Sequence, residues 1–210
     1  MRQLKEKMTI EEFETILDDI FINSKDRRER KYASEEMKPL LKYAKHKKAS
    51  FITYTGNVSE NSIDGILFYS NGEQENIEIT TITDKYKENI VECITREKGP
   101  FTCGAGETVD DLKNRTGYIT KNKIKDKNIE DSSFDSGIID DNYVLNKCEE
   151  VIMKKINKKD KYKDYTLLLT IGDMNSFIME DYNFIENIKR LWNSIENNQF
   201  KNLFIIDSFT

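Results

Sequence analysis

Two carboxylates stand on either side of a strong turn signal. Asp64 precedes the dipeptide Asn71-Gly72, and Glu78 follows it at a similar separation. An Asn-Gly pair between two apolar runs is typical of a β-hairpin, so folding the chain back there brings Asp64 and Glu78 close together. Their oxygens suit a hard divalent ion, which can activate water and neutralise the charge of a scissile phosphate. Thr80 lies two residues beyond Glu78 and therefore points to the same strand face.

The surrounding sequence predicts the helices and strands that would position these residues. Thr9 and Glu12 have the form of a capping box and begin a helical apolar pattern. Pro39 marks an early helical turn or a bend within a second helical region. Segments rich in β-branched and aromatic residues indicate several strands. In chain order we expect helices over 10–22 and 27–47, a strand over 49–56, the hairpin strands 62–70 and 75–83, and a further strand over 91–97.

Residues 98–140 differ from the segments before and after them. They carry few periodic apolar residues, which indicates a long insertion with local structure of its own. Gly104-Ala105-Gly106 has the spacing of neither glycine-rich phosphate motif, so we interpret it as a turn.

Regular patterns return in the last third of the sequence. An apolar stripe predicts a helix over 142–158. The unbroken apolar runs at 165–172 and 203–208 predict neighbouring parallel strands in a central position, with a helix over 180–198 crossing one face. Because no linker or repeat divides the chain, we predict one α/β domain over residues 1–210, with a mixed central sheet flanked by helices.

The order of these elements resembles the core of the PD-(D/E)XK, or restriction-endonuclease-like, nuclease superfamily over about half of the chain. The corresponding segments are the helix with Glu35 and Glu36, the strand over 49–56, Ile63-Asp64-Gly65, Glu78-Ile79-Thr80, the helix over 142–158 and the strand over 165–172. The resemblance implies an α-β-β-β-α-β core and metal-dependent hydrolysis of phosphodiester bonds in DNA, in a restriction, repair or mobile-element context. It further implies that Asp64 and Glu78 bind Mg²⁺ or Mn²⁺, and that Glu35 or Glu36 completes the shell. For Glu35 and Glu36 the other interpretation is that of helix first-turn acids favoured by the helix dipole.

Thr80 departs from the pattern of this superfamily, which has a lysine at that position. In the superfamily the lysine orients the attacking water or stabilises charge on the phosphate, and in some members it has moved to another element, often the following helix. Lys155 is the best substitute here because it borders the predicted apolar stripe of its helix, whereas Lys85 and Lys154 are weaker candidates. Thr80 itself would then position water through its hydroxyl.

Two other functions stay open because of this departure. The first is a catalytically inactive nuclease-like scaffold that binds nucleic acid or a protein partner. The second is an interaction protein without nuclease ancestry, whose binding surface is the 98–140 insertion. The sequence also leaves open whether the chain forms a homodimer.

The composition limits which metal or disulfide sites the chain can form and where in the cell we expect it. Three cysteines without CxxC spacing and a single histidine favour neither a disulfide framework nor a zinc site. The sequence has no apolar run of roughly 18 residues and no signal-peptide pattern, so we expect a cytoplasmic protein without a membrane partner. The net charge of -5 argues against indiscriminate binding to polyanions, although basic runs could line a phosphate-contacting surface. Those runs are 25–31, 42–48, 121–127 and 154–163.

Three further residues have simpler interpretations than a role in catalysis. His46 fits a solvated helix end, Asp173 fits a helix N-cap, and Asp207 fits a solvated carboxylate close to the end of the sequence. Each aspartate lies at the end of a predicted buried strand, where sites form in open α/β sheets.

Overall fold

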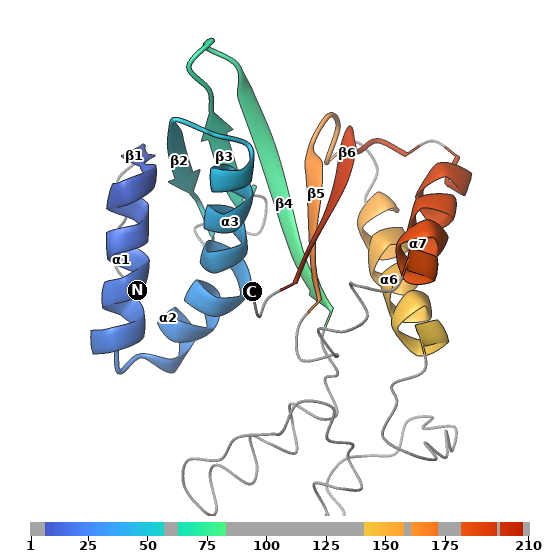
Figure 1. Ribbon diagram of the computed structural model, residues 1–210, viewed down its shortest axis with the longest axis horizontal. Helices are drawn as coiled ribbons and strands as arrows, with labels where there is room; N and C mark the ends of the chain where they lie inside the picture. The colour runs from blue at the N-terminus through green and yellow to red at the C-terminus, as the bar shows by residue number, and fades with distance from the viewer. Residues whose placement is uncertain are drawn as a thin grey trace, which may run out of the picture.

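A six-stranded mixed sheet organises the protein, and its strands lie in sequence order from β1 to β6 (Figure 1). The computed structural model describes residues 7–56, 63–82, 141–157, 161–171, 182–196 and 198–207. Neighbouring strands from β1 to β4 are antiparallel, whereas β4, β5 and β6 are parallel. The strands are β1 (Met8–Thr9), β2 (Phe51–Tyr54), β3 (Gly65–Phe68), β4 (Gln74–Ile82), β5 (Thr166–Ile171) and β6 (Asn202–Asp207). The predicted mixed α/β architecture is therefore confirmed, with β1 as an additional short strand that the sequence pattern did not indicate.

The hairpin predicted around Asn71-Gly72 is present; β3 is shorter than expected, whereas β4 has the expected length and begins one residue earlier. β3 and β4 pair from Gly65–Ile77 to Phe68–Gln74. In the turn Gly72 has a φ of +85°, a conformation that glycine adopts without the steric cost of a side chain. The Tyr69 amide closes the turn by donating to the Glu73 carbonyl oxygen at 3.0 Å.

The N-terminal helices form as predicted, with one irregularity. Helix α1 (Ile10–Asn23) begins at the expected capping box, in which Thr9 Oγ1 accepts from the Glu12 amide at 3.2 Å and the Thr9 amide donates to Glu12 Oε2 at 3.0 Å. The second helical region consists of α2 (Arg27–Tyr32), a π-helical turn (Ala33–Met37) and α3 (Lys38–His46).

Pro39 explains why the wider π-helical turn precedes α3. Proline lacks the amide hydrogen that would bond to the carbonyl four residues earlier, that of Glu35. The Glu35 carbonyl oxygen accepts instead from Thr81 Oγ1 of β4 at 3.2 Å. This bond ties the π-helical turn to the sheet beside the predicted acidic residues.

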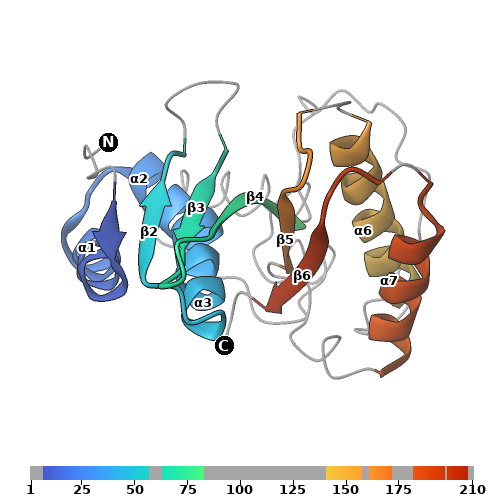
Figure 2. The ribbon, with the colours of Figure 1, turned by 90° about the horizontal axis from the view of Figure 1, so that it is seen from above.

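Helices cover the two faces of the sheet, and each face has its own apolar core. Helices α1 and α3 pack over one face, while α6 (Asp141–Ile156) and α7 (Tyr182–Ser194) pack over the other face at β4 to β6 (Figure 2). Strand β5 is buried on both faces, as its unbroken apolar run predicted: Leu168 belongs to the core beneath α1 and α3, whereas Leu167 and Leu169 belong to the core beneath α6 and α7. None of the helices that the structure describes is long and apolar enough to cross a membrane.

The predicted central position of 203–208 is wrong, although its parallel pairing with the preceding strand is confirmed. β6 is the last strand of the sheet in the described part of the chain. Its apolar character has another cause: Phe204 packs against Tyr43 and the exposed His46, with ring centroids 4.8 and 5.0 Å apart, while Leu203 and Ile205 are half-buried against the other core. An edge strand covered by helices on both faces thus carries the same pattern as a central one.

Some of the predicted features lie outside the described residues. They are the strand over 91–97, the insertion over 98–140 and its Gly104-Ala105-Gly106 turn.

Candidate active site

Asp64 occupies the point at which β3 and β4 stop pairing. The last paired residues there are Gly65 and Ile77, and the Asp64 amide donates to the Ile77 carbonyl oxygen at 3.2 Å. Asp64 Oδ2 accepts from the Ile79 amide at 2.7 Å. The Asp64 side chain thus accepts a hydrogen bond from a β4 amide beyond the end of the β3–β4 ladder. This bond fixes the carboxylate at the fork between the two strands.

Glu78 and Lys155 form a partly desolvated ion pair beside this fork. Glu78 lies on β4 and is only 4% exposed. Lys155, close to the C-terminal end of α6, pairs its Nζ with Glu78 Oε1, and its own side chain is 20% exposed. Glu78 Oε2 is buried and has no hydrogen-bond partner among the described residues. One oxygen of this carboxylate is therefore satisfied by an ammonium, whereas the other is a buried acceptor without a hydrogen-bond donor among the described residues.

Glu36 approaches the same place from the opposite helical layer. It lies in the π-helical turn, and its Oε2 accepts from the Tyr54 hydroxyl at 2.5 Å. Burial raises the pKa of Glu36, and the nearby negative charge of Glu78 raises it further, while the Tyr54 hydrogen bond and Lys155 act in the opposite direction. Burial and the Glu36 charge also raise the pKa of Tyr54. Glu36 and Tyr54 therefore belong to the electrostatic environment of Glu78.

The two acids predicted on this helical region thus have different positions. The Glu35 carboxylate lies 3.5 Å from the Lys31 ammonium, and Glu35 contacts β4 through its carbonyl oxygen. Of the pair, the structure brings the Glu36 carboxylate toward Asp64 and Glu78.

Asp64 experiences the combined effect of burial and crowded charge. Burial, together with the charges of Glu78 and Glu36, raises its pKa to about 7. The Ile79 hydrogen bond and the Lys155 ammonium lower it, but do not offset the other contributions. Raised carboxyl pKa values of this kind are common where two acids share a functional site, because one ionised group opposes ionisation of the other.

Tyr162 lines the site and was not predicted from the sequence. It is 1% exposed, and its ring centroid lies 5.8 Å from Lys155 Nζ. The ring stacks on Phe200 with centroids 5.2 Å apart. Burial and the Glu78 charge raise the pKa of the Tyr162 hydroxyl. The only sequence signal for Tyr162 or Tyr54 is an aromatic residue in an apolar segment, which equally describes an ordinary core position.

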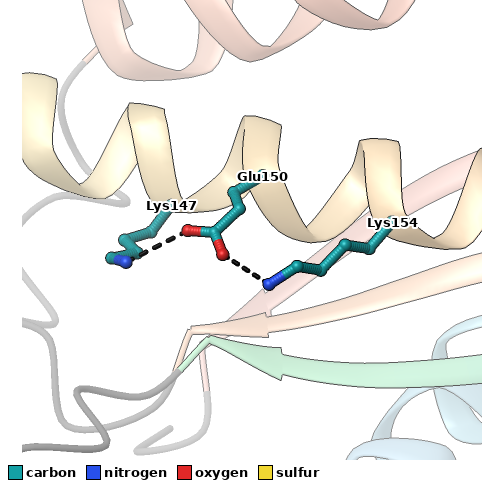
Figure 3. Close-up of polar contacts among 3 residues, drawn as sticks. All are labelled: Lys147, Glu150 and Lys154. Atoms are coloured by element: carbon teal, nitrogen blue, oxygen red, sulfur yellow. Dashed lines mark hydrogen bonds and ion pairs between the residues drawn. The ribbon is translucent and has the colours of Figure 1, made fainter. Parts of the chain in front are cut away.

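The remaining candidates are placed less directly. Thr80 is half-buried on β4, two residues beyond Glu78, and its carbonyl oxygen accepts from Thr170 Oγ1 at 3.2 Å. Lys154 is exposed and pairs with Glu150, which also pairs with Lys147 (Figure 3). Lys154 therefore belongs to the surface of α6, whereas its neighbour Lys155 belongs to the site. Lys85, Asp173 and the Asp207 side chain lie outside the described residues.

The donor chemistry of the site fits an ion held by two carboxylates. Across the described ranges, no group of three or more His, Cys, Asp or Glu side chains is arranged to hold a metal ion. Mg²⁺ commonly takes only one or two protein carboxylates and completes its shell with water and phosphate oxygens. Asp64, with its raised pKa, and the unpartnered Glu78 Oε2 are the oxygens that would gain most from a cation.

Comparisons of the chain with protein-family models, with curated proteins and with solved structures find no match. Function is therefore inferred from the chemistry of the residues that meet at the fork. Two carboxylates and an ammonium together can bind a cation and neutralise a phosphate.

Proposed function

We propose that this chain is a metal-dependent nuclease that hydrolyses phosphodiester bonds in DNA, with a site like that of the PD-(D/E)XK nucleases. The observation that carries the proposal is the meeting of Asp64, Glu78 and Lys155 at one point. These residues come from the position just before β3, from β4 and from α6, and Lys155 is the lysine that the helical spacing nominated. Among the described elements, the order α3, β2, β3, β4, α6 and β5 supports the α-β-β-β-α-β core that the resemblance implies.

Each residue has a role that follows from its position. A Mg²⁺ or Mn²⁺ ion supplies, when bound, charge neutralisation and a more acidic water molecule. Asp64 and Glu78 would hold it through Asp64 carboxylate oxygens and Glu78 Oε2, the oxygen that has no other partner in the described structure. Lys155 brings the ammonium that Thr80 lacks, which would orient the attacking water and stabilise charge on the phosphate. The Thr80 hydroxyl would donate or accept one further hydrogen bond with that water.

Lys155 can replace a lysine on β4 because the chemistry depends on where the ammonium lies. Its Nζ contacts Glu78 Oε1, so the charge lies at the acidic centre although the residue belongs to a helix. The Tyr162 ring and the partial burial of the lysine stem restrict where the ammonium can move. A positioned charge of this kind contributes to catalysis because it needs no reorganisation during the reaction.

A supercoiled-plasmid assay with Mg²⁺ and Mn²⁺ titrations tests the proposal. We expect the wild type to nick or linearise the plasmid only with a divalent ion, and Asp64→Asn and Lys155→Met to reduce cleavage at least 100-fold, a loss typical for one electrostatic catalytic group. Lys154→Met is the matched control, because it removes a neighbouring lysine that pairs with Glu150 at the surface. Cleavage that survives in Asp64→Asn, or that needs no divalent ion, would contradict the proposal.

A nuclease-like scaffold without catalytic activity is the second candidate. It is favoured by the ion pair itself, since Lys155 neutralises Glu78 in the way that a structural pair would, and by the uncharged Thr80. Thr80→Lys separates the two functions. In an enzyme that uses Lys155, the added lysine should leave cleavage unchanged or lower it; in a scaffold that lost only its motif lysine, it should create cleavage.

A further inference from the structure

Two phenylalanines and a lysine form a small aromatic surface at the other end of the hairpin. Phe51 of β2 and Phe68 of β3 are direct partners in the antiparallel ladder. Lys7 Nζ lies 4.5 Å from the Phe51 ring centroid and 4.3 Å from that of Phe68. The Phe51 side chain is 37% exposed, and among the large apolar side chains of the described structure only that of Ile22 is more exposed. We call Lys7, Phe51 and Phe68 the aromatic platform.

The platform lies on the same face of the sheet as Glu78. On β2 and β3 the alternate residues Ile52 and Leu67 enter the core beneath α1 and α3, so Phe51 and Phe68 point to the opposite face. Phe68 pairs with Gln74, and side chains two and four residues further along β4 share that face, which leads to Glu78. Four residues of strand span roughly 13 Å.

The described helices on this face of the sheet do not extend over β2 and β3. Helices α6 and α7 pack at β4 to β6, and in both ribbon views they lie away from β2 and β3 (Figures 1 and 2). The platform and the Glu78–Lys155 pair thus lie on the same face of the sheet, and Asn76 of β4 lies between them.

The aromatic platform is chemically complementary to an unpaired nucleotide. Aromatic rings on a sheet bind bases by stacking, without regard to sequence. The Lys7 ammonium lies over both rings, and its flexible stem allows it to move to a phosphate and leave the rings to a base. Bases in a duplex are already stacked on their neighbours and do not offer their faces to a protein ring. A single strand offers both the base faces and the phosphates.

We propose that the aromatic platform binds unpaired bases of a single-stranded nucleic acid, and that the nucleic acid continues along β4 to the Asp64–Glu78–Lys155 site. This inference rests on the proposed function, for which it names the substrate as single-stranded nucleic acid or a duplex with a single-stranded end. The roughly 13 Å along β4 from Gln74, the partner of Phe68, to Glu78 corresponds to a few nucleotides, consistent with the roughly 4-nucleotide lower limit of single-strand sites on other sheet-based binding domains.

Binding in EDTA tests the platform apart from any cleavage. Fluorescence anisotropy compares a labelled 12-nucleotide single strand, as DNA and as RNA, with the DNA duplex of the same sequence. We expect tighter binding of a single strand than of the duplex, a fivefold or greater loss of single-strand affinity in Phe51→Leu, and retained affinity in Phe51→Trp. Ile22→Ala is the control, because Ile22 is 78% exposed on α1 and lies away from the platform. The DNA and RNA arms identify which strand the platform prefers.

Salt dependence tests the role assigned to Lys7. Lys7→Gln should lower the slope of log affinity against log salt by about one, as expected for the loss of one phosphate contact. Equal affinity for the duplex, unchanged single-strand affinity in Phe51→Leu, or no binding of any oligonucleotide by the wild type would overturn the platform proposal.

The outcomes distinguish the platform from the proposed nuclease. Loss of single-strand affinity in Phe51→Leu without any cleavage by the wild type supports the platform and refutes the nuclease, which leaves the scaffold function. Metal-dependent cleavage by Phe51→Leu with wild-type KM and kcat on a single strand refutes the platform and supports the nuclease.

Discussion

Removing the Lys155 ammonium should destabilise the fold far more than removing that of its neighbour. Lys155→Met keeps most of the length and apolar character of the side chain but leaves Glu78, which is 4% exposed, without the cation that contacts Oε1. Taking one partner from a buried ion pair costs about 3 kcal/mol or more, because the remaining charge stays buried. For a domain of this size that corresponds to a fall in Tm of about 6–12 °C.

Lys154→Met is the matched comparison on the same helical turn. Its side chain is 69% exposed, and its partner Glu150 also contacts Lys147. Exposed ion pairs contribute about 0–1 kcal/mol, so this variant should unfold within about 1 kcal/mol of the wild type.

Urea denaturation followed by Trp192 fluorescence and circular dichroism measures both variants. A cycle with Glu78→Gln and the double variant gives the coupling of the pair, for which we expect about 2 kcal/mol. The double variant should be more stable than Lys155→Met alone, because it no longer buries an unpaired charge. If Lys155→Met costs no more than Lys154→Met, or if the cycle gives no coupling, then Lys155 does not neutralise Glu78 and the site described above is wrong.

Two further predictions concern the fork between β3 and β4. The folded-state pKa of Asp64, about 7, lies above its ordinary value of 3.8, so the folded state holds this proton more tightly than the unfolded state. The free energy of unfolding should therefore fall by on the order of 4 kcal/mol as the pH rises from about 4 to 7. Asp64→Asn should remove that part of the pH dependence in EDTA. Denaturation curves at several pH values check this, and an identical pH profile in Asp64→Asn would show that Asp64 is not buried among charges. Gly65→Ala should destabilise by about 1–3 kcal/mol, since its Cβ would lie 2.6 Å from Leu40 Cδ2 in a fully buried contact. Gly72→Ala, with open space but a φ of +85°, should cost about 1 kcal/mol, and a smaller loss by urea denaturation at Gly65 than at Gly72 would argue against close packing of α3 on β3.

The parts of the fold that follow from local chemistry were predictable from the sequence. The capping box at Thr9 and the turn at Gly72 each depend on a few adjacent residues, and both form as expected. The position of β6 was not predictable in the same way. Its apolar run reports burial on two faces, and only the full packing of α3 and α7 shows that such burial also occurs at a sheet edge.

In the candidate site, too, some residues could be predicted from local sequence and others depend on long-range packing. The hairpin register follows from the turn, so the approach of Asp64 to Glu78 could be inferred from their positions on either side of it. Lys155 could be nominated from the helical period, but the choice between Lys154 and Lys155 depends on which side of α6 meets the sheet. Glu36 and Tyr162 depend on long-range packing, on the π-helical turn before Pro39 and on the segment after α6, for which the sequence carries no distinct signal.

Metal-dependent thermal stabilisation tests the central claim, that Asp64 and Glu78 hold a divalent ion, most directly. Wild type and Asp64→Asn are heated in EDTA and in rising Mn²⁺ or Mg²⁺ up to millimolar concentrations, without nucleic acid. A ligand at 100 times its Kd stabilises the folded state by about 2.7 kcal/mol, which predicts a rise in wild-type Tm of about 5–10 °C. Asp64→Asn should remain folded and show no such rise. A wild-type Tm that does not change with either ion, or a rise of equal size in Asp64→Asn, would contradict the account.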